Sequence, residues 1–348
     1  MKFIKIIDRS IGSGFPCFII AEAGVNHNGN LELAHQMIDA AAISGADAIK
    51  FQTFQAEKLV TGDAKKASYQ EQTTGSGESQ LEMLRKLELP LSGYGELISH
   101  CQKKNILFLS TPFDEGSADF LIKTGMPVLK IPSGEITNLP FLRFLSLKKL
   151  PMIVSTGMAT LGEIESAVQL IRGVGSDEFV LLHCVTNYPT PPEEVNLRVM
   201  NLLYHAFDVP VGYSDHTNGT EVALAAAALG ACVIEKHFTL DRNMEGPDHQ
   251  ASLNADELTA MVRGIRVIET ALGNGIKMPS ATEKETAAVI RRSLIAACDI
   301  PIGAELSLEM VVIKRPGSGL PPAMLSQLLG RRAKREIAAG TLLAFDMF

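Results

Sequence analysis

Two histidines stand where two short apolar segments end, and each has a polar neighbour two residues before it. One segment closes with Glu235 and His237, and the other closes with Ser214 and His216. Residues two apart in a strand point to the same face. Imidazole suits first-row divalent metals, so two such strands in one sheet can bring both rings onto one ion. The alternative is that each histidine is a hydrogen-bonded structural residue.

Other strand-like segments also end in polar residues. They are Glu22 with Asn26–Gly29, Lys50 with Gln52, Thr111, Lys130 with Ser133, Ser155, and Asn187 with Tyr188. Any single one can be a cap or a turn residue; Asn28 or Asn30 could cap the first helix, for example. Together, the lysines, serines and asparagine predict a cationic, hydroxyl-rich cradle for a phosphate and a carboxylate.

A cradle of this kind beside a divalent ion favours aldol-type or lyase-type carbon–carbon chemistry on a phosphorylated keto acid or enol. The ion would polarise an aldehyde oxygen, and Glu22 or Glu235 would transfer protons. A Schiff-base aldolase is the rival on the same scaffold. In that case Lys50 or Lys130 would be a nucleophile with a lowered pKa, and the histidine pair would not be needed.

The elements that must position these residues alternate between strand and helix. The predicted strands are 18–23, 48–54, 106–112, 128–133, 152–157, 180–185, 211–214 and 232–238. The predicted helices are 31–44, 94–104, 116–124, 139–148, 161–173, 197–206, 221–229 and 256–272. Eight such units predict a TIM (β/α)8 barrel, whose chemistry sits at the carboxyl ends of the strands. An open doubly wound sheet is less favoured, because no Gly-x-Gly-x-x-Gly turn follows the first strand. The long interruption 55–80 is expected to be a surface loop or lid at the active face.

Composition limits the class of protein. The chain has 348 residues, 46% of them hydrophobic and 20% charged, with a net charge of −7. This balance argues against nucleic acid or an anionic membrane as a partner. Five cysteines without a Cys-x-x-Cys pair argue against a disulfide framework and fit a reducing cytoplasm. The longest apolar run, 222–234, is too short to cross a bilayer, and the N-terminus lacks an apolar region of signal-peptide length.

The alternation stops after Asn274. A helical window at 281–290 leads into short strand-like pieces at 292–297, 311–313 and 342–344. We therefore expect a catalytic barrel over 1–275, a linker over 276–290 and a small β-rich domain over 291–348. Residues 289–348 carry eight Lys and Arg against five Asp and Glu. A basic tail on an acidic body suggests that the tail meets something negative.

Seven motifs occur together in one order: Phe18–Gly29 (FIIAEAGVNHNG), Lys50–Phe54 (KFQTF), Ser110–Asp114 (STPFD), Lys130–Gly134 (KIPSG), Ser155–Thr160 (STGMAT), Tyr213–His216 (YSDH) and Glu235–Thr239 (EKHFT). Together they resemble the sialic acid (N-acetylneuraminate) synthase family, which includes legionaminic acid synthases. The resemblance extends through Gly246–Asp248 and the C-terminal segment, so it covers essentially the whole chain. It implies that the last domain is an antifreeze-like (SAF) domain.

The resemblance also implies an activity. Phosphoenolpyruvate would condense with an open-chain N-acetylmannosamine-type sugar to give a nonulosonic acid, with phosphate leaving by C–O cleavage. His216 and His237 would hold Mn²⁺ or Mg²⁺. The residues expected to be catalytic are Glu22, Lys50, Glu235, His216 and His237. Those expected to bind phosphoenolpyruvate are Lys50, Lys130, Ser133, Ser155, Asn187 and Ser214, and those expected to contact the sugar are Gln52, Tyr188, Asp248 and Arg315.

Relatives of this kind imply a homodimer with swapped SAF domains, in which Arg315 reaches the sugar in the other subunit. With only two protein ligands, the metal should bind weakly and need to be added back after purification. Two alternatives remain open. One is a legionaminic acid synthase using 2,4-diacetamido-2,4,6-trideoxymannose, and the other is a non-catalytic carbohydrate-binding barrel. Thr73 stands where relatives have Asn, and Glu245 and Gln250 are further positions where sugar specificity could lie.

Overall fold

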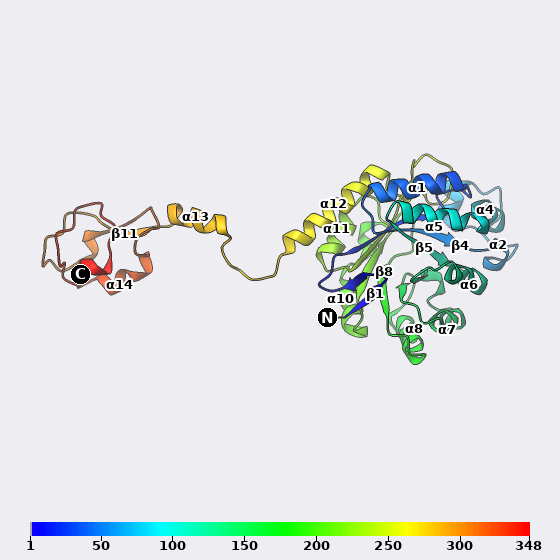
Figure 1. Ribbon diagram of the computed structural model, residues 1–348, viewed down its shortest axis with the longest axis horizontal. Coiled ribbons are helices and arrows are strands. Elements are labelled where there is room, and N and C mark those ends of the chain that lie inside the picture. The colour runs from blue at the N-terminus through cyan, green and yellow to red at the C-terminus, as the bar shows by residue number, and fades with distance from the viewer. Residues whose placement is uncertain (1) are drawn as a thin grey trace. The chain divides into compact units, whose positions relative to one another are not determined.

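The computed structural model describes residues 2–348 and divides the chain into two compact units, one ending at Gly273 and one spanning Asn274–Phe348. Eight parallel strands form the inner layer of the first unit (Figure 1). They are β3 (Phe18–Gly24), β4 (Ala48–Thr53), β5 (Leu107–Pro112), β6 (Leu129–Ile131), β7 (Met152–Ser155), β8 (Phe179–Cys184), β9 (Val211–Asp215) and β10 (Val233–His237). Their order is β5-β4-β3-β10-β9-β8-β7-β6, and the outermost strands β5 and β6 contact each other. The predicted TIM barrel is therefore confirmed as a nearly closed barrel.

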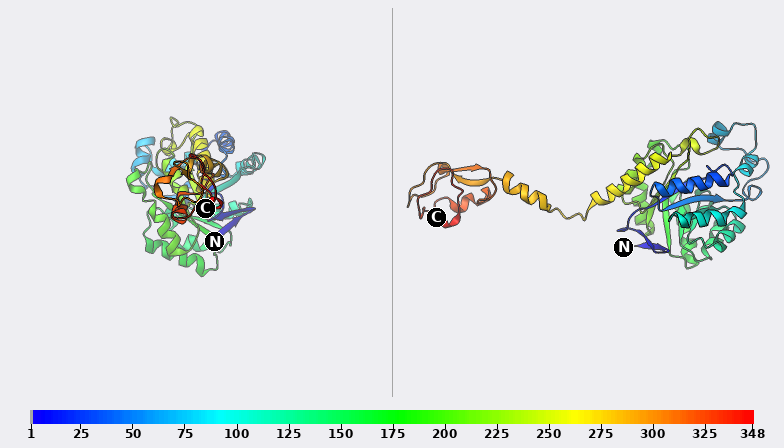
Figure 2. Two further views of the ribbon diagram at one scale, coloured as in Figure 1. Left: turned by 90° about the vertical axis from the view of Figure 1, so that its left-hand side faces the viewer. Right: turned by 45° about the horizontal axis from the view of Figure 1, so that its top comes forward.

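Helices cover the outside of the strands (Figure 2). The main ones are α1 (Leu31–Ile43), α5 (Tyr94–Lys103), α6 (Glu115–Lys123), α7 (Leu139–Ser146), α8 (Leu161–Gly173), α10 (Arg198–Phe207), α11 (Glu221–Ala228) and α12 (Ala255–Leu272). Short pieces are α9 (Pro192–Val195) and the 3₁₀ turns η1 (Leu91–Gly93), η2 (Ser133–Glu135) and η3 (His249–Ala251). Asn30 caps α1 by accepting hydrogen bonds from the backbone N–H groups of Glu32 and Leu33.

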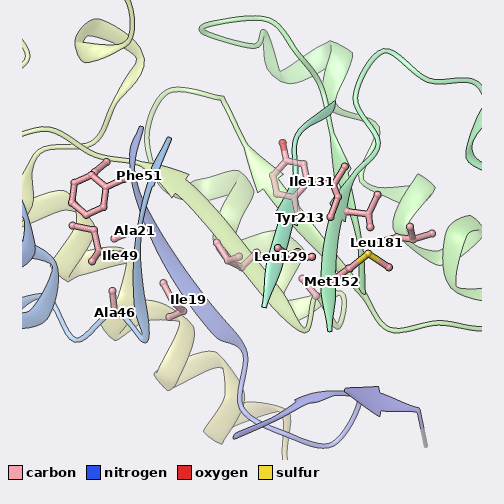
Figure 3. Close-up of a cluster of buried hydrophobic side chains, with 14 of the residues drawn as sticks. Ile19, Ala21, Ala46, Ile49, Phe51, Leu129, Ile131, Met152, Leu181 and Tyr213 are labelled. Carbon is pink, nitrogen blue, oxygen red and sulfur yellow. The ribbon is translucent and has the colours of Figure 1, made fainter. Parts of the chain in front are cut away.

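The two faces of each strand have different neighbours because side chains alternate along it. Outward residues such as Ile19, Phe51 and Leu181 pack against the helices in the main core, part of which Figure 3 shows. Inward residues near the strand starts, such as Ile20 and Val180, form a separate apolar layer inside the barrel. The interior is therefore a packed core at its amino-terminal end.

An N-terminal hairpin, which the sequence did not lead us to expect, closes that end. Strands β1 (Phe3–Ile6) and β2 (Arg9–Gly12) pair antiparallel. Their residues Ile4, Ile6 and Ile11 are buried in the apolar layer inside the barrel. The hairpin thus plugs the end of the barrel opposite to the strand carboxyl ends.

The interruption after β4, which we expected to be a surface loop or lid at the active face, contains helices. It contains α2 (Ala56–Leu59) and α3 (Ser68–Thr74), and α4 (Gln80–Leu87) follows directly. A capping box between Ser79 and Glu82 begins α4. The buried Lys66 ammonium binds the Thr74 hydroxyl and the Gly75 carbonyl and so ties the segment together. We call residues 55–87 the helical insertion.

The second unit has its own small core. It contains α13 (Ala281–Ile290), β11 (Ser293–Ala296), η4 (Leu308–Met310), β12 (Val311–Lys314), η5 (Pro322–Met324), α14 (Leu325–Leu328) and η6 (Phe345–Met347). Strands β11 and β12 pair antiparallel around buried residues such as Leu294 and Leu328. The strand predicted at 342–344 is reduced to a single bridge between Leu342 and Ile295. Among the helices of residues 2–348, none is long and apolar enough to cross a membrane.

Candidate functional site

The inward-facing positions change from apolar to polar toward the carboxyl end of the barrel strands. On β3, Phe18 and Ile20 lie in the inner apolar layer, whereas Glu22 lines a cavity; on β10, Val233 lies in the layer and Glu235 lines the cavity. This cavity has a volume of about 410 Å³. It lies at the end of the barrel where the chemistry of this fold is found.

Lys50 is the centre of the acidic side of the cavity. Its ammonium lies 2.7 Å from Glu22 Oε2 and 3.7 Å from Glu235 Oε2. It also donates to the Thr111 hydroxyl at 2.9 Å. All three charged side chains are at least 90% buried. Because buried charges are costly unless paired, this arrangement holds the carboxylates and the ammonium in fixed positions.

Lys130 provides the second buried cation. Its ammonium donates to Ser155 Oγ at 2.7 Å and lies 3.5 Å from Glu235 Oε1. Ser214 donates to the same carboxylate oxygen at 3.0 Å. Glu235 therefore lies between two ammonium groups and the Ser214 hydroxyl, which an anionic ligand could contact in its place.

The two carboxyl groups have opposite pKa shifts. Burial raises the pKa of Glu22 to about 7, and Lys50 opposes this only in part. Burial also disfavours ionised Glu235, but Lys130 and Lys50 outweigh it and lower the pKa of that group to about 2. The Glu22 carboxyl can therefore exchange a proton near neutral pH while Glu235 stays ionised. With both lysines charged, the site then has a net positive charge, which favours the binding of an anion.

The two predicted metal ligands lie side by side. The rings of His216 and His237 have their centroids 5.5 Å apart. His216 Nδ1 donates to the Val185 carbonyl at 2.7 Å, which leaves the lone pair of Nε2 free to bind a metal ion. His237 Nδ1 is buried and has no hydrogen-bond partner among residues 2–348, and burial lowers the pKa of that ring well below its usual value. Burial opposes a charge on His216, but Cys184 and the Val185 carbonyl outweigh it and raise the pKa of that ring. In their neutral forms the two imidazoles fit a divalent cation, whose binding would displace any proton from His216 Nε2.

The two histidines are not part of a larger preformed ligand set in residues 2–348. Across the described chain, no group of three or more His, Cys, Asp or Glu side chains is placed to hold an ion. Two imidazoles alone would leave most coordination positions to substrate and water. The ring of Tyr188 packs against both histidines, at 4.1 Å from His216 and 5.7 Å from His237 between centroids.

Most of the predicted site residues meet in this cavity. The lining includes the residues Glu22, Lys50, Gln52, Lys130, Ser133, Ser155, Tyr188, Ser214, His216, Glu235, His237 and Asp248. Asn187, which was also expected in the site, is exposed and is not among the lining residues. Thr186, its neighbour, lines the cavity instead. Arg315 belongs to the second unit.

Several lining residues were not predicted as site residues. Cys184 ends β8 and lies 3.8 Å from His216 Nδ1. The helical insertion adds Tyr69, Gln70 and Gln80, and the Tyr69 ring packs on Tyr188 at 5.0 Å. The helical spacing of the insertion is the feature of the sequence that could have pointed to Tyr69, Gln70 and Gln80.

Comparisons with known proteins agree with this architecture. The chain is 51% identical over 91% of its length to the N,N'-diacetyllegionaminic acid synthase of Campylobacter jejuni, covering 96% of that protein. It is 47% identical over 96% of its length to the enzyme of the same name from Legionella pneumophila, covering 95% of it. A crystal structure of N-acetylneuraminic acid (sialic acid) synthetase from Leptospira borgpetersenii superposes with a TM-score of 0.72 at 38% identity, covering 82% of this chain and 95% of that one.

Two family models match the chain. The model of the SAF domain matches residues 291–348, which lie within the second unit. The model of the NeuB family matches residues 37–277, which include seven of the eight barrel strands. Together with relatives that align over nearly their whole length, these matches show that the chain belongs to the NeuB family and ends in a SAF domain.

Proposed function

We propose that the chain is a phosphoenolpyruvate-dependent synthase that builds a nonulosonic acid from an open-chain N-acylated mannosamine-type sugar. The observation that carries the proposal is the buried pair of Lys50 and Lys130, which share Glu235 at 3.7 and 3.5 Å beside the two histidines. A cationic floor suits the phosphate and carboxylate of phosphoenolpyruvate. The imidazole pair suits the aldehyde end of the acceptor.

In this reaction, Lys50, Lys130, Ser155 and Ser214 hold the phosphate and the carboxylate. The CH₂ carbon of phosphoenolpyruvate forms the new bond to the aldehyde carbon, and the aldehyde oxygen takes up a proton, for which Glu22 with its pKa of about 7 is the available acid. Water adds at the former enol carbon and gives one proton to the Glu22 carboxylate that the first step left behind. The new hydroxyl becomes the keto oxygen as the bond from that carbon to the phosphate oxygen breaks, and its proton leaves with the phosphate. The products are a keto acid and inorganic phosphate.

His216 and His237 would hold Mn²⁺ or Mg²⁺, which supplies Lewis-acid polarisation of the aldehyde when bound. The protein's own part is to orient the acceptor: Gln52, Tyr188 and Asp248 line the same cavity and would contact its hydroxyl and amide groups. Gln52 Nε2 already reaches Glu22 Oε1 at 3.4 Å. An acceptor bound by Gln52 would therefore lie close to the proposed acid.

The favoured acceptor is 2,4-diacetamido-2,4,6-trideoxymannose. Relatives at 51% and 47% identity are named N,N'-diacetyllegionaminic acid synthases, whereas a mouse N-acetylneuraminate-9-phosphate synthase is 36% identical. The expectation that N-acetylmannosamine is the acceptor has less support. A carbohydrate-binding barrel without turnover is also less favoured, because the buried lysines, carboxylates and histidines of the site are all present.

Phosphate release tests the proposal. We expect release from phosphoenolpyruvate only when both the acceptor and Mn²⁺ are present, and we expect ¹⁸O from the bridging position of phosphoenolpyruvate to appear in the phosphate. Lys130→Met should abolish release, whereas Lys148→Met, which alters a half-buried lysine on the outside of the barrel, should not. Acceptor-independent release, or ¹⁸O retained in the keto acid, would contradict the mechanism.

The Schiff-base alternative has a weaker basis. The carboxylates of Glu22 and Glu235 outweigh burial and raise the pKa of Lys50, which keeps it protonated and non-nucleophilic. Burial lowers the pKa of Lys130, so this lysine is the remaining candidate. Borohydride added with substrate should leave the mass of the protein unchanged, and a stable adduct on Lys130 would support the alternative.

We further propose that the protein works as a homodimer with swapped SAF domains, in which Arg315 of one chain contacts the acceptor in the barrel of the other. The family membership supports this arrangement. Mixing Lys130→Met chains with Arg315→Ala chains tests it, because one mixed active site would then keep both intact residues. We expect the mixture to regain activity that neither variant has alone, and no recovery after exchange of subunits would argue against action in trans.

A further inference from the structure

One wall of the cavity is apolar, in contrast to its charged floor. Met83, Leu84 and Leu87 of α4 line the cavity and belong to a small cluster with Val25 and Phe113, which also line it. Positions 83, 84 and 87 fall on one face of a helix. Met83 and Leu87 are almost fully buried, and Leu84 is half-buried. The helical insertion thus presents a hydrocarbon surface to whatever occupies the outer part of the cavity.

Two side-chain amides border this surface. Gln80 lies one turn before Leu84 on α4, and its Nε2 donates to Gln70 Oε1 of α3 at 3.4 Å. Gln70 Oε1 also accepts from the Ala67 N–H at 3.0 Å, and both glutamine side chains line the cavity. We call Gln70, Gln80, Met83, Leu84 and Leu87 the insertion wall. It combines amide groups with an apolar patch.

The insertion wall lies close to the reaction site. Tyr69, the neighbour of Gln70 on α3, packs on Tyr188 at 5.0 Å, and Tyr188 packs on His216 at 4.1 Å. If the aldehyde of the acceptor lies at the histidines and its anionic partner lies on the lysines, the remaining carbons of the acceptor would extend toward α3 and α4. Hydroxyl groups turned toward Met83 or Leu87 would lose water without gaining a partner, which is unfavourable.

We infer that the insertion wall selects an acceptor that carries an acylamino group and a deoxygenated carbon at its far end. An acetamido substituent has an N–H, a C=O and a methyl, which match the Gln80 and Gln70 amides and the apolar patch. A terminal methyl in place of a hydroxymethyl group suits the same patch. The inference rests on the proposed function and extends it, because it names the residues that separate a diacetamido-trideoxy acceptor from N-acetylmannosamine.

The test compares kcat/KM for these two acceptors at saturating phosphoenolpyruvate and Mn²⁺. For the wild-type chain we expect at least a tenfold preference for the diacetamido-trideoxy sugar. Gln80→Leu removes one amide partner and should reduce this preference about fivefold. Leu84→Gln places a polar group in the apolar patch. It should reduce the preference for the diacetamido-trideoxy sugar by a similar factor, chiefly by lowering kcat/KM for that acceptor.

Gln72→Leu is the matched control, because Gln72 is exposed on α3 and does not line the cavity. It should leave the preference unchanged. KM for phosphoenolpyruvate should stay constant in all three variants, which shows that the barrel is intact. The inference is overturned if Gln80→Leu and Leu84→Gln keep the wild-type preference, or if Gln72→Leu shifts it equally. No phosphate release with either acceptor would instead overturn the proposed function, so the two failures are distinguishable.

Discussion

The ammonium of Lys236 lies 2.8 Å from Asp215 Oδ2, and both side chains are completely buried. The two residues are register partners on β10 and β9, and each directly precedes a histidine of the site. Because neighbouring residues on a strand point to opposite faces, the ion pair lies behind the histidines and not in the cavity. It fixes the relative position of the two strands that carry His216 and His237.

Breaking this ion pair should destabilise the protein strongly. Lys236→Met leaves the Asp215 carboxylate buried and unpaired, and we expect a loss of about 3–5 kcal/mol in the free energy of unfolding. Urea titration followed by circular dichroism measures it. The partly exposed pair of Lys148 and Asp119 provides the control, and Lys148→Met should cost less than about 1 kcal/mol. Equal losses in the two variants would show that the buried pair has no special role.

Metal removal should abolish activity reversibly. Dialysis against a chelator should stop turnover, and Mn²⁺ should restore it, because two imidazoles bind the ion weakly. His216→Gln and His237→Gln should each lower kcat/KM at least about 100-fold at fixed Mn²⁺, since even residues that only orient a ligand cost up to about that factor. His205→Gln, which alters an exposed histidine, should behave like the wild type. Full activity after exhaustive chelation would contradict the two-histidine site.

Buried His27 should make the protein sensitive to acid. Burial lowers its pKa from 6.5 to about 4. The unfolded chain therefore binds the extra proton between pH 6.5 and pH 4, so the contribution of His27 is complete above pH 6.5 and is lost as the pH falls toward 4. The shift corresponds to roughly 3 kcal/mol. His27→Gln should make the free energy of unfolding less dependent on pH in this window. A variant with the same slope as the wild type would contradict the role of His27.

A change in the loop that carries Asp248 should weaken the binding of the acceptor but not the binding of phosphoenolpyruvate. His249 joins it to two other segments, with Nδ1 2.7 Å from Thr239 Oγ1 and Nε2 3.3 Å from Asn28 Oδ1. We expect His249→Ala to raise KM for the acceptor about fivefold, the effect of losing about one hydrogen bond, with KM for phosphoenolpyruvate unchanged. Asn243→Ala, in the exposed part of the same loop, is the control. A parallel rise in both KM values would point to general damage to the barrel.

The barrel and the floor of the site were predictable because both follow from one repeating pattern. In β3 and β10, an apolar residue at an inward position is followed two residues later by a charged one, as in Ile20 and Glu22 or Val233 and Glu235. This period-two pattern fixes both the strand and the face of its polar end. The direction of residues beyond a strand end depends on the path of the loop, which is why Asn187 was expected in the cavity and Thr186 was not.

The helical insertion was missed for a different reason. Its polar residues and the Thr73–Gly77 stretch suggested a loop, although Gln80, Met83, Leu84 and Leu87 already have helical spacing after a Ser79 cap. The N-terminal hairpin gave little local signal, because each strand has only four residues and is stabilised by burial inside the distant barrel. Elements whose stability comes from remote contacts are the hardest to recognise locally.

The hairpin plug at the amino-terminal end of the barrel also bears on the order of events in the site. With Ile4, Ile6 and Ile11 packed into that end, the described cavity is approached from the side of the strand carboxyl ends. If phosphoenolpyruvate binds Lys50 and Lys130 and the acceptor lies against α4, as we propose, phosphoenolpyruvate would have to enter first and the acceptor would cover it until turnover. This arrangement predicts an ordered sequential mechanism in which the acceptor sugar binds second.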